Sequence, residues 1–474
     1  MSTVLHRRTF LRDLGIIAGG VALSGPLEAL AARVAAGAPL MGAGYGDLVD
    51  MGDLFLPEDF EYRIISAQGD PMSDGNPTPS RFDGMIAFET GHGTTVLIRN
   101  HENKRRFMGN AILSPMNEID VVVPPDLRYD PNPMWNGGVT RLEVRGRKVR
   151  DSRAVLGGTT HNCAGGPTPW GTWITCEELS QPPPGPAPGV ASLRHGYIFE
   201  VDAFNEAPQA AVPIIAAGRC EHEAVAWLDG ILYETEDRPA ACFYRFVPSI
   251  EPAAPGDLAS NGGVLQALVV TGHPDLDTRT ATGWPGGVGA THPVEWVTIQ
   301  NPDPASDMGP GSIRTQAQDQ HAAIFARTEG CWATDDTVLF DCTTGGWTVA
   351  MPPNGNGQVF ELDPQAGTLT LVYQSAVTDP ALDMPDNLVV SPRTGDLFLC
   401  EDNGENNHIR GLTEDGLIFN FAQAKTNPTE FCGACFDGNG ITMYVNQQGS
   451  QEQPGVTYAI WGPWKRQHSG GTRG

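Results

Sequence analysis

Residues 161–178 read HNCAGGPTPWGTWITCEE, and this stretch contains a short apolar strand, 172–175, that runs into two adjacent carboxylates. Neighbouring side chains on a strand point to opposite faces, so Glu177 and Glu178 can serve one site only where the strand ends and the chain turns. We therefore place both at a strand end. Cys163 precedes two glycines that can bring the backbone close to a bound ion, which makes the stretch a candidate ligand site. The alternative is a surface loop with a buried structural cysteine and two solvated glutamates.

The same arrangement recurs along the chain. Short apolar strands end in acidic, amide or hydroxyl residues in six segments: VLIRNHE (96–102), TWITCEE (172–178), ILYETED (231–237), VLFDCTT (338–344), LFLCEDN (397–403) and ITMYVNQQ (441–448). A second β segment follows each of them: GVTRLEV (138–144), GYIFEVD (196–202), FYRFVPS (243–249), GQVFELD (357–363), GLIFNFA (416–422) and GVTYAIW (455–461). Equivalent strand ends converge on a shared axis when sheets are arranged radially. The sequence therefore predicts a six-bladed β-propeller with its active site at one mouth of the central channel, and a large β-sandwich with long loops is the alternative.

Composition also favours an all-β fold. The chain of 474 residues contains 57 glycines and 39 prolines, and only 18% of its residues are charged, which suits many short strands joined by turns. No charge block, long linker or heptad pattern divides the chain. We therefore expect residues 32–474 to form a single propeller domain.

The net charge of −26 argues against two classes of partner. Nucleic acids and anionic membranes both attract basic patches, so we expect neither of them to bind this protein. A strongly acidic chain fits cation binding better, although many acidic surfaces serve only solubility.

The N-terminus resembles a twin-arginine export signal. Arg7 and Arg8 precede a short apolar run, and small residues frame a cleavage site near Ala31, so we expect residues 1–31 to be removed. The alternative is a membrane helix, but Pro26 interrupts a run that is too short to span a bilayer. We expect the twin-arginine export machinery as a partner, a periplasmic or secreted location, and no stable membrane association after cleavage.

The cysteine count bears on the thiol of Cys163. Nine cysteines in an exported chain permit four disulfides and leave at least one thiol without an intramolecular partner. Cys163 is our candidate for this odd thiol, as a metal-bound thiolate. Cys432 and Cys435 form a C-x-x-C pair, for which a disulfide or plain burial is favoured over zinc because no second pair accompanies it.

Further carboxylates follow in the middle of the chain. Glu223 precedes an apolar alternation and is a candidate ligand, with an ion pair to Arg219 or His222 as the competing interpretation. Glu234 and Glu236 share a strand face, and hard oxygen ligands at such a spacing favour calcium. A solvated strand end is the alternative for this pair.

Two later segments carry candidate site residues. Arg327 stands two positions before Glu329, which permits either a plain salt bridge or an anion-binding arginine beside a metal-binding glutamate. Asp386 and Glu401 follow turn-like or strand-end sequences, where acidic residues also occur for purely structural reasons.

These motifs, taken in order, resemble the PhoX family of exported alkaline phosphatases. The resemblance spans roughly residues 50–465 and rests on NHE, NCAGGPTPWGTWITCEE, HEAVAW with LYETED, ARTEG, DMPDNLVVSPRTGDLFLCEDN and FCGACFDGNGITMYVN followed by AIWGPW. It implies a six-bladed propeller whose active site holds two ferric ions (Fe3+) and up to three calcium ions (Ca2+), bridged by an oxo or hydroxide group.

The resemblance also implies roles for individual residues. Cys163 matches an iron-binding cysteine, and Arg327 matches a phosphate-contacting arginine. Three glutamates match metal ligands, namely Glu178, Glu223 and Glu329. Four more carboxylates fall in shared motifs without an assigned ion: Glu177, Glu236, Asp386 and Glu401.

The function that follows from this resemblance is hydrolysis of phosphate monoesters by metal-activated oxygen attack at phosphorus, without a serine intermediate. Such an enzyme would release phosphate for uptake. Two alternatives remain, a phosphodiesterase or phosphotriesterase on the same cluster, and a calcium-binding propeller that catalyses nothing.

Overall fold

The computed structural model describes residues 41–91, 93–104, 107–108, 111–112, 118–180, 193–347, 355–378, 380–413 and 416–465. The expected export signal at 1–31 lies outside these ranges. The described residues contain two short α-helices, α3 (Asp257–Asn261) and α4 (Ile313–Gln318), and one 3-10 turn, η2 (Ile215–Ala217), while their other regular elements are strands. No helix in this part of the chain is long and apolar enough to cross a membrane. The all-β prediction is confirmed.

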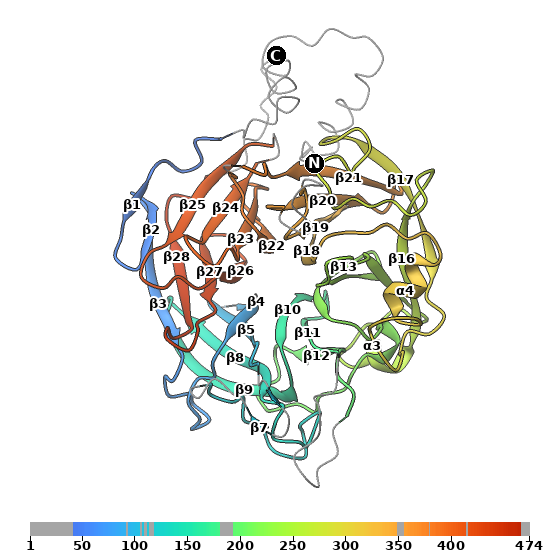
Figure 1. Ribbon diagram of the computed structural model, residues 1–474. Coiled ribbons are helices and arrows are strands. Elements are labelled where there is room, and N and C mark those ends of the chain that lie inside the picture. The colour runs from blue at the N-terminus through green and yellow to red at the C-terminus, as the bar shows by residue number, and fades with distance from the viewer. Residues whose placement is uncertain are drawn as a thin grey trace.

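The strands form antiparallel sheets around a common centre (Figure 1). One four-stranded sheet contains β4 (Phe82–Gly91), β5 (Thr94–His101), β8 (Gly137–Arg145) and β9 (Val149–Thr159). A three-stranded sheet contains β10 (Asn162–Pro167), β11 (Thr172–Glu177) and β12 (Ile198–Asp202). Another four-stranded sheet contains β26 (Phe431–Phe436), β27 (Thr442–Gln447), β28 (Val456–Trp461) and β3 (Glu61–Ala67).

Two larger sheets complete the ring. The six-stranded one contains β22 (Pro385–Val390), β23 (Leu397–Glu401), β24 (His408–Leu412), β25 (Ile418–Ala424), β2 (Leu54–Pro57) and β1 (Leu48–Asp50). The nine-stranded one contains β13 (His222–Leu228), β14 (Ile231–Glu236), β15 (Tyr244–Pro248), β16 (Gly263–Val270), β17 (Thr291–Thr298), β21 (Thr368–Gln374), β20 (Gln358–Asp363), β19 (Val338–Cys342) and β18 (Thr328–Ala333). A separate two-stranded hairpin contains β6 (Phe107–Met108) and β7 (Ala111–Ile112).

The sheet sizes correct the expectation of six separate blades. The physical reason is the long strand β17, which pairs with β16 through residues 294–298 and with β21 through residues 291–293. It thereby joins two groups of strands into one continuous sheet. The arrangement as a whole is propeller-like, because the strands β4, β10, β13, β18, β22 and β26 contact one another in turn around the centre.

The chain closes this ring by pairing its N-terminal strands with its C-terminal ones. β3 pairs antiparallel with β28, and β2 pairs with β25. These pairs satisfy backbone groups that would otherwise lie at open sheet edges. β2 and β3 thereby join the two C-terminal sheets.

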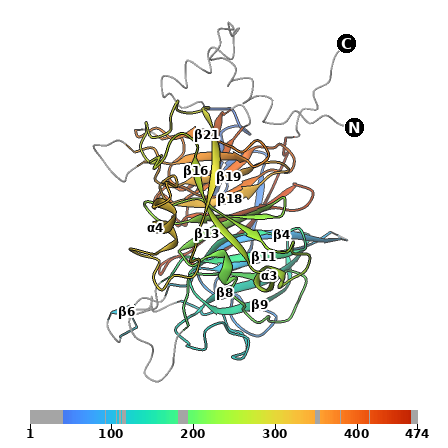
Figure 2. The ribbon, with the colours of Figure 1, turned by 90° about the vertical axis from the view of Figure 1, so that its right-hand side faces the viewer.

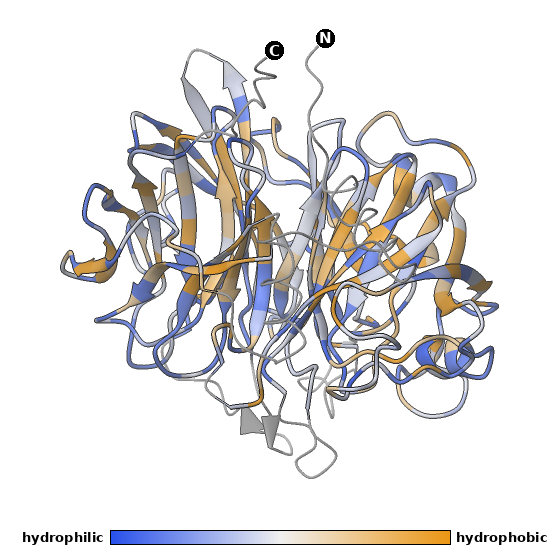
Figure 3. Ribbon diagram, turned by 90° about the horizontal axis from the view of Figure 1, so that it is seen from above, coloured by the Kyte–Doolittle hydropathy of each residue, from blue (hydrophilic) through white to orange (hydrophobic). Residues whose placement is uncertain are grey.

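Apolar side chains fill the space between and within the sheets. The strands carry most of the hydrophobic residues, while hydrophilic residues concentrate in the connections (Figure 3). Stacked aromatic rings contribute to this core, for example Phe243 and Phe340, whose centroids lie 4.1 Å apart. The two short helices lie at the periphery, with α4 beside β16 (Figure 2).

Candidate functional site

Each strand of the inner ring begins with a shift in strand register. These irregularities fall between Phe82 and Met85, Asn162 and Gly165, His222 and Val225, Thr328 and Cys331, Pro385 and Asn387, and Cys432 and Cys435. A β-bulge leaves a residue out of the ladder and re-aims its side chain, which is why bulges recur beside active sites. The residues inside the six shifts include Asp83, Cys163, Glu223, Glu329, Asp386 and Gly433.

Two further sets of residues lie at the end of the next strand of each sheet. The final strand residues are His101, Glu177, Glu236, Cys342, Glu401 and Gln447, and all six are fully buried. The residues immediately after them are Glu102, Glu178, Asp237, Thr343, Asp402 and Gln448. Because side chains alternate at a strand end, these two sets point in different directions.

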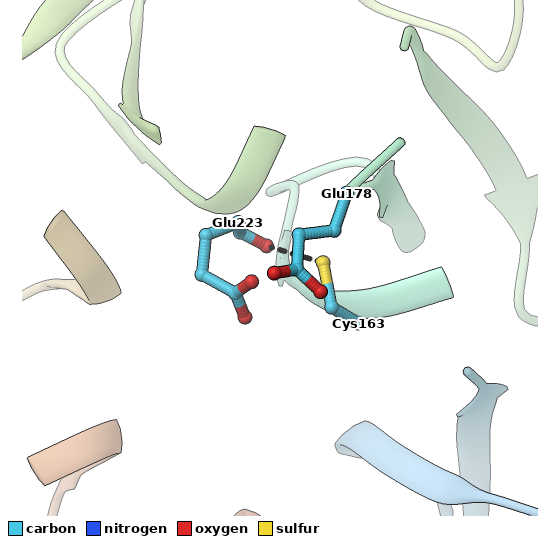
Figure 4. A group of neighbouring side chains, drawn as sticks. All are labelled: Cys163, Glu178 and Glu223. Carbon is cyan, nitrogen blue, oxygen red and sulfur yellow. Dashed lines mark hydrogen bonds between the residues drawn. The ribbon is translucent and has the colours of Figure 1, made fainter. Parts of the chain in front are cut away.

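Nine of the described residues form four overlapping groups with potential metal ligands. Within each group the ligand atoms lie within 4.8 Å of one another, and the groups are Cys163–Glu178–Glu223, Glu223–Glu329–Asp386, Asp386–Asp402–Glu430 and Asp83–Glu102–Glu430. Glu223, Asp386 and Glu430 each belong to two groups, so the four form one continuous chain of donors. In the first group, the thiol and two carboxylates converge from separate segments (Figure 4).

Most of these carboxyl groups repel one another in a buried setting. Burial, and then the charges of Asp386 and Glu178, raise the pKa of Glu223 well above its usual range. Burial and Asp402 raise the pKa of Asp386 to about 7. Burial followed by Asp402 likewise raises the pKa of Glu430. Bound cations would remove this repulsion, so the donor set favours occupation by metal ions.

Two basic side chains lie among the carboxylates. Lys104 forms an ion pair with Glu102, and its Nζ lies 3.9 Å from Glu178, so it links the first donor group to the last. Burial lowers the pKa of Lys104, but the charges of Glu102 and Glu178 outweigh it and raise that pKa well above its usual value. Arg327 is the other cation, and its guanidinium pairs with Asp237 and Glu329.

Cys163 is a buried free thiol, as are the other eight cysteines of the chain. Its Sγ donates to the carbonyl oxygens of His222 at 3.2 Å and Glu223 at 3.5 Å. Burial, and then the charge of Glu223, raise the pKa of this thiol. Plain burial is therefore also the outcome for the C-x-x-C pair, because Cys432 and Cys435 are both free and buried.

The structure brings together five of the eight proposed metal ligands: Cys163, Glu178, Glu223, Glu329 and Asp386. The three others lie outside the four groups and have structural partners. Glu177 accepts hydrogen bonds from backbone N–H groups and lies 2.7 Å from His195, while Glu236 pairs with Arg314 and accepts from Tyr244. Glu401 accepts hydrogen bonds from the backbone N–H groups of Asp383 and His408 and from Arg410 Nε at 2.7 Å.

Sequence reasoning missed Asp83, Glu102, Asp402 and Glu430 as members of the donor groups. Glu102 and Asp402 follow a strand, as Glu178 does, and this shared position was the signal that could have identified them. Asp83 lies in a bulge, and Glu430 immediately precedes β26, where nothing in the local sequence distinguishes a ligand from a loop residue.

All six inner strands line one small cavity. A cavity of about 30 Å³ is lined by small residues, including Gly84, Ala164, Ala224 and Gly330, and by Trp173. That volume holds a water molecule or two and excludes a phosphoester. A phosphoester bound at the carboxylates therefore lies outside this cavity.

The donor set fits a mixed group of metal ions. Eight carboxylates and one thiol surround the site, while Lys104 and Arg327 are the cations paired with them among the described residues. Carboxylate oxygens suit hard ions such as calcium, and a thiolate suits iron better than calcium.

Comparisons with known proteins point to one family. The model of the alkaline phosphatase PhoX family matches residues 43–155 and 142–451, which is most of the chain. A solved structure of Pseudomonas fluorescens PhoX in complex with vanadate, a transition state analogue, is 17% identical; the match covers 90% of this chain and 98% of that one, with a TM-score of 0.63. The WD40 domain of Neurospora crassa Pan2 is 8% identical with a TM-score of 0.34, over 86% of this chain and 97% of that one.

The sequence finds no relative among curated proteins. The family match covers the bulged strands and the strand-end carboxylates of all four donor groups. On this match, the chain belongs to the PhoX family of alkaline phosphatases.

Proposed function

We propose that this protein hydrolyses phosphate monoesters outside the cytoplasm, using iron and calcium held by the four donor groups. The observation that carries the proposal is the continuous chain of eight carboxylates and one thiol with Arg327 at its side. Metal ions bound there would supply Lewis-acid stabilisation of the phosphoryl oxygens and would activate an oxygen nucleophile.

The chain's own residues have distinct tasks in this proposal. Cys163, with Glu178 and Glu223, holds iron, because thiolate is the soft donor of the set. The all-carboxylate groups suit calcium. Arg327 donates hydrogen bonds to non-bridging phosphate oxygens, whose charge must be stabilised throughout phosphoryl transfer.

Lys104 has a supporting task in this proposal. It balances the charges of Glu102 and Glu178 where these two carboxylates approach each other. The small cavity between the inner strands has no room for a phosphoester, so in this proposal the mouth is the route for substrate and product.

The architecture and location belong to the same proposal. We count the six strands of the inner ring as six blades, with the nine-stranded sheet as two blades joined by β17. Residues 1–31 serve as a twin-arginine export signal, the machinery for that route is a partner, and the mature domain begins near residue 32. Release of phosphate in the periplasm or outside the cell would supply uptake.

The experiment is an assay of purified protein, loaded with iron and calcium, on p-nitrophenyl phosphate and on bis(p-nitrophenyl) phosphate. Faster turnover of the monoester, abolished by chelation and restored by the metals, is the expected result. Faster turnover of the diester would favour a phosphodiesterase. No turnover of either ester by fully metallated protein would leave a metal-binding propeller without catalysis.

A further inference from the structure

Asp237 holds the guanidinium of Arg327 by a two-point contact. Arg327 donates from Nε to Asp237 Oδ1 at 2.7 Å and from Nη2 to Asp237 Oδ2 at 2.9 Å. This parallel geometry fixes the plane of a guanidinium as well as its position. The Asp237 side chain is only 11% exposed, and it belongs to none of the four donor groups found among the described residues.

The backbone on both sides of this contact is braced to the same segment. Arg327 N–H donates to the carbonyl of Arg238 at 2.9 Å, and Glu236 N–H donates to Thr328 Oγ1 at 2.9 Å. Arg327 also has a positive φ of 52°, a conformation that a non-glycine residue adopts only when its surroundings hold it there. Segment 236–238 therefore fixes both the backbone and the side chain of Arg327.

The contact with Glu329 has a different character. Arg327 Nη2 lies 2.6 Å from Glu329 Oε1, yet this buried oxygen receives no hydrogen bond from the described residues. Glu329 therefore attracts the guanidinium by charge, while Asp237 gives it direction. In the described part of the chain, Nη1 has no hydrogen-bond acceptor, so this nitrogen stays available.

We propose that Asp237 is a positioning residue for phosphate recognition: its carboxylate fixes the Arg327 guanidinium so that Nη1 remains free to donate to a phosphate oxygen. The inference rests on the proposed phosphatase function and adds to it a residue that acts only through Arg327. Three roles for Asp237 are thereby separable, because positioning, metal ligation and simple charge predict different changes in phosphate binding.

A purely electrostatic role and a positioning role predict opposite changes in phosphate affinity. Replacing Asp237 by Asn removes a negative charge beside the site, so a purely electrostatic role predicts tighter binding of inorganic phosphate. A positioning role predicts weaker binding, because an amide cannot accept both guanidinium hydrogen bonds. A ligand role predicts that metal ions are lost.

The test uses the full-length, metal-loaded protein with the variants Asp237→Asn and Asp237→Ser, each alone and combined with Arg327→Met. The dissociation constant of inorganic phosphate is measured by calorimetry, iron and calcium by plasma mass spectrometry, and KM and kcat on p-nitrophenyl phosphate. In Asp237→Asn we expect the dissociation constant of phosphate and the KM to rise about ten- to a hundredfold. This is the range for loss of a residue that orients a ligand-binding side chain. Metal content should be unchanged, and in the Arg327→Met background either Asp237 variant should add less than about twofold, because the effect passes through Arg327.

Loss of metal from both Asp237 variants would overturn the inference in favour of a ligand. Tighter phosphate binding would overturn it in favour of simple charge, and a full effect in the Arg327→Met background would show that Asp237 does not act through Arg327. The calorimetric measurement distinguishes failure of the positioning role from failure of the proposed function. Wild-type protein that binds phosphate but turns over no ester would refute the proposed function, and weakened phosphate binding in Asp237→Asn would still support the positioning role.

Discussion

His195 Nδ1 lies 2.7 Å from Glu177 Oε1, and neither side chain is exposed to solvent. The other ring nitrogen lies 3.4 Å from Asp130 Oδ2, so the imidazole stands between two carboxylates. Trp135 packs against the ring, with centroids 4.1 Å apart. This buried unit anchors the end of β11, and Glu178, the next residue, enters the first donor group.

The His195–Glu177 pair makes the free energy of unfolding decrease at alkaline pH. Burial lowers the pKa of His195, but the charge of Glu177 and the hydrogen bonds to Asp130 and Glu177 raise it to about 9. A raised pKa stabilises the folded state fully below the unfolded value of about 6.5, and this contribution disappears as pH rises through about 9. We expect a loss on the order of 3 kcal/mol between pH 7 and pH 10. Denaturant unfolding of wild type and His195→Gln at both values measures it, and an equal pH dependence in the two proteins would contradict it.

Glu177 and Glu178 provide a matched pair of variants. Glu178→Gln should lower metal content, because its carboxylate lies within 4.8 Å of Cys163 and Glu223 ligand atoms. Glu177→Gln should keep the metals and lower stability by about 3–5 kcal/mol, because it breaks a buried ion pair. Metal analysis and unfolding curves on the same preparations check both. Metal loss in Glu177→Gln alone would show that Glu177, and not Glu178, is the ligand.

Arg327→Lys should impair catalysis without emptying the site. Lysine keeps the charge but not the planar fork, so kcat/KM should fall by about 10²–10³, the scale for removing one preorganised donor. Inorganic phosphate should also inhibit the variant less. Arg279→Lys is the control, because Arg279 makes the same two-point contact with Asp277 away from the donor groups. A fully metallated Arg327→Lys with unchanged phosphate inhibition would remove Arg327 from the site.

Cys163→Ser should lose most of its iron and retain its fold. A serine hydroxyl is a poor substitute for a thiolate as a ligand of iron, while Cys163 is only one of many buried residues in its hydrophobic cluster. Cys435→Ser is the control, since Cys435 is equally buried but lies outside the donor groups. Burying a hydroxyl costs about 1–3 kcal/mol at either position. Equal iron content in the two variants would argue against a thiolate ligand.

Much of the fold was predictable because it follows from repeated local patterns. The six predicted segments with polar ends all form strands. Each lies next to the inner strand of its group, and the six strands are β5, β11, β14, β19, β23 and β27. The fusion by β17 was not predictable, because it depends on which strand edges meet after the chain has folded. In the six-stranded sheet β24 also lies between β23 and the predicted second segment, 416–422.

The sequence predicts which strand ends contribute to the site, but not which residue at each end enters it. Glu236 and Glu401 are the last residues of their strands and have structural partners. Of the residues that follow them, Asp402 joins a donor group and Asp237 pairs with Arg327. Sequence identifies such acidic pairs but not the residue at which the ladder ends, since pairing with the neighbouring strand decides that. The bulges that aim Asp83 and Asp386 are likewise set by strand register.

Metal stoichiometry tests the central claim most directly. Plasma mass spectrometry on wild-type protein exported by its native route should find both iron and calcium, with more than one metal ion per chain, because the four donor groups extend beyond the reach of a single ion. Removal of these metals should abolish hydrolysis of p-nitrophenyl phosphate, and their return should restore it. Protein that contains calcium alone, or that hydrolyses the ester at full rate without metal, would contradict the account.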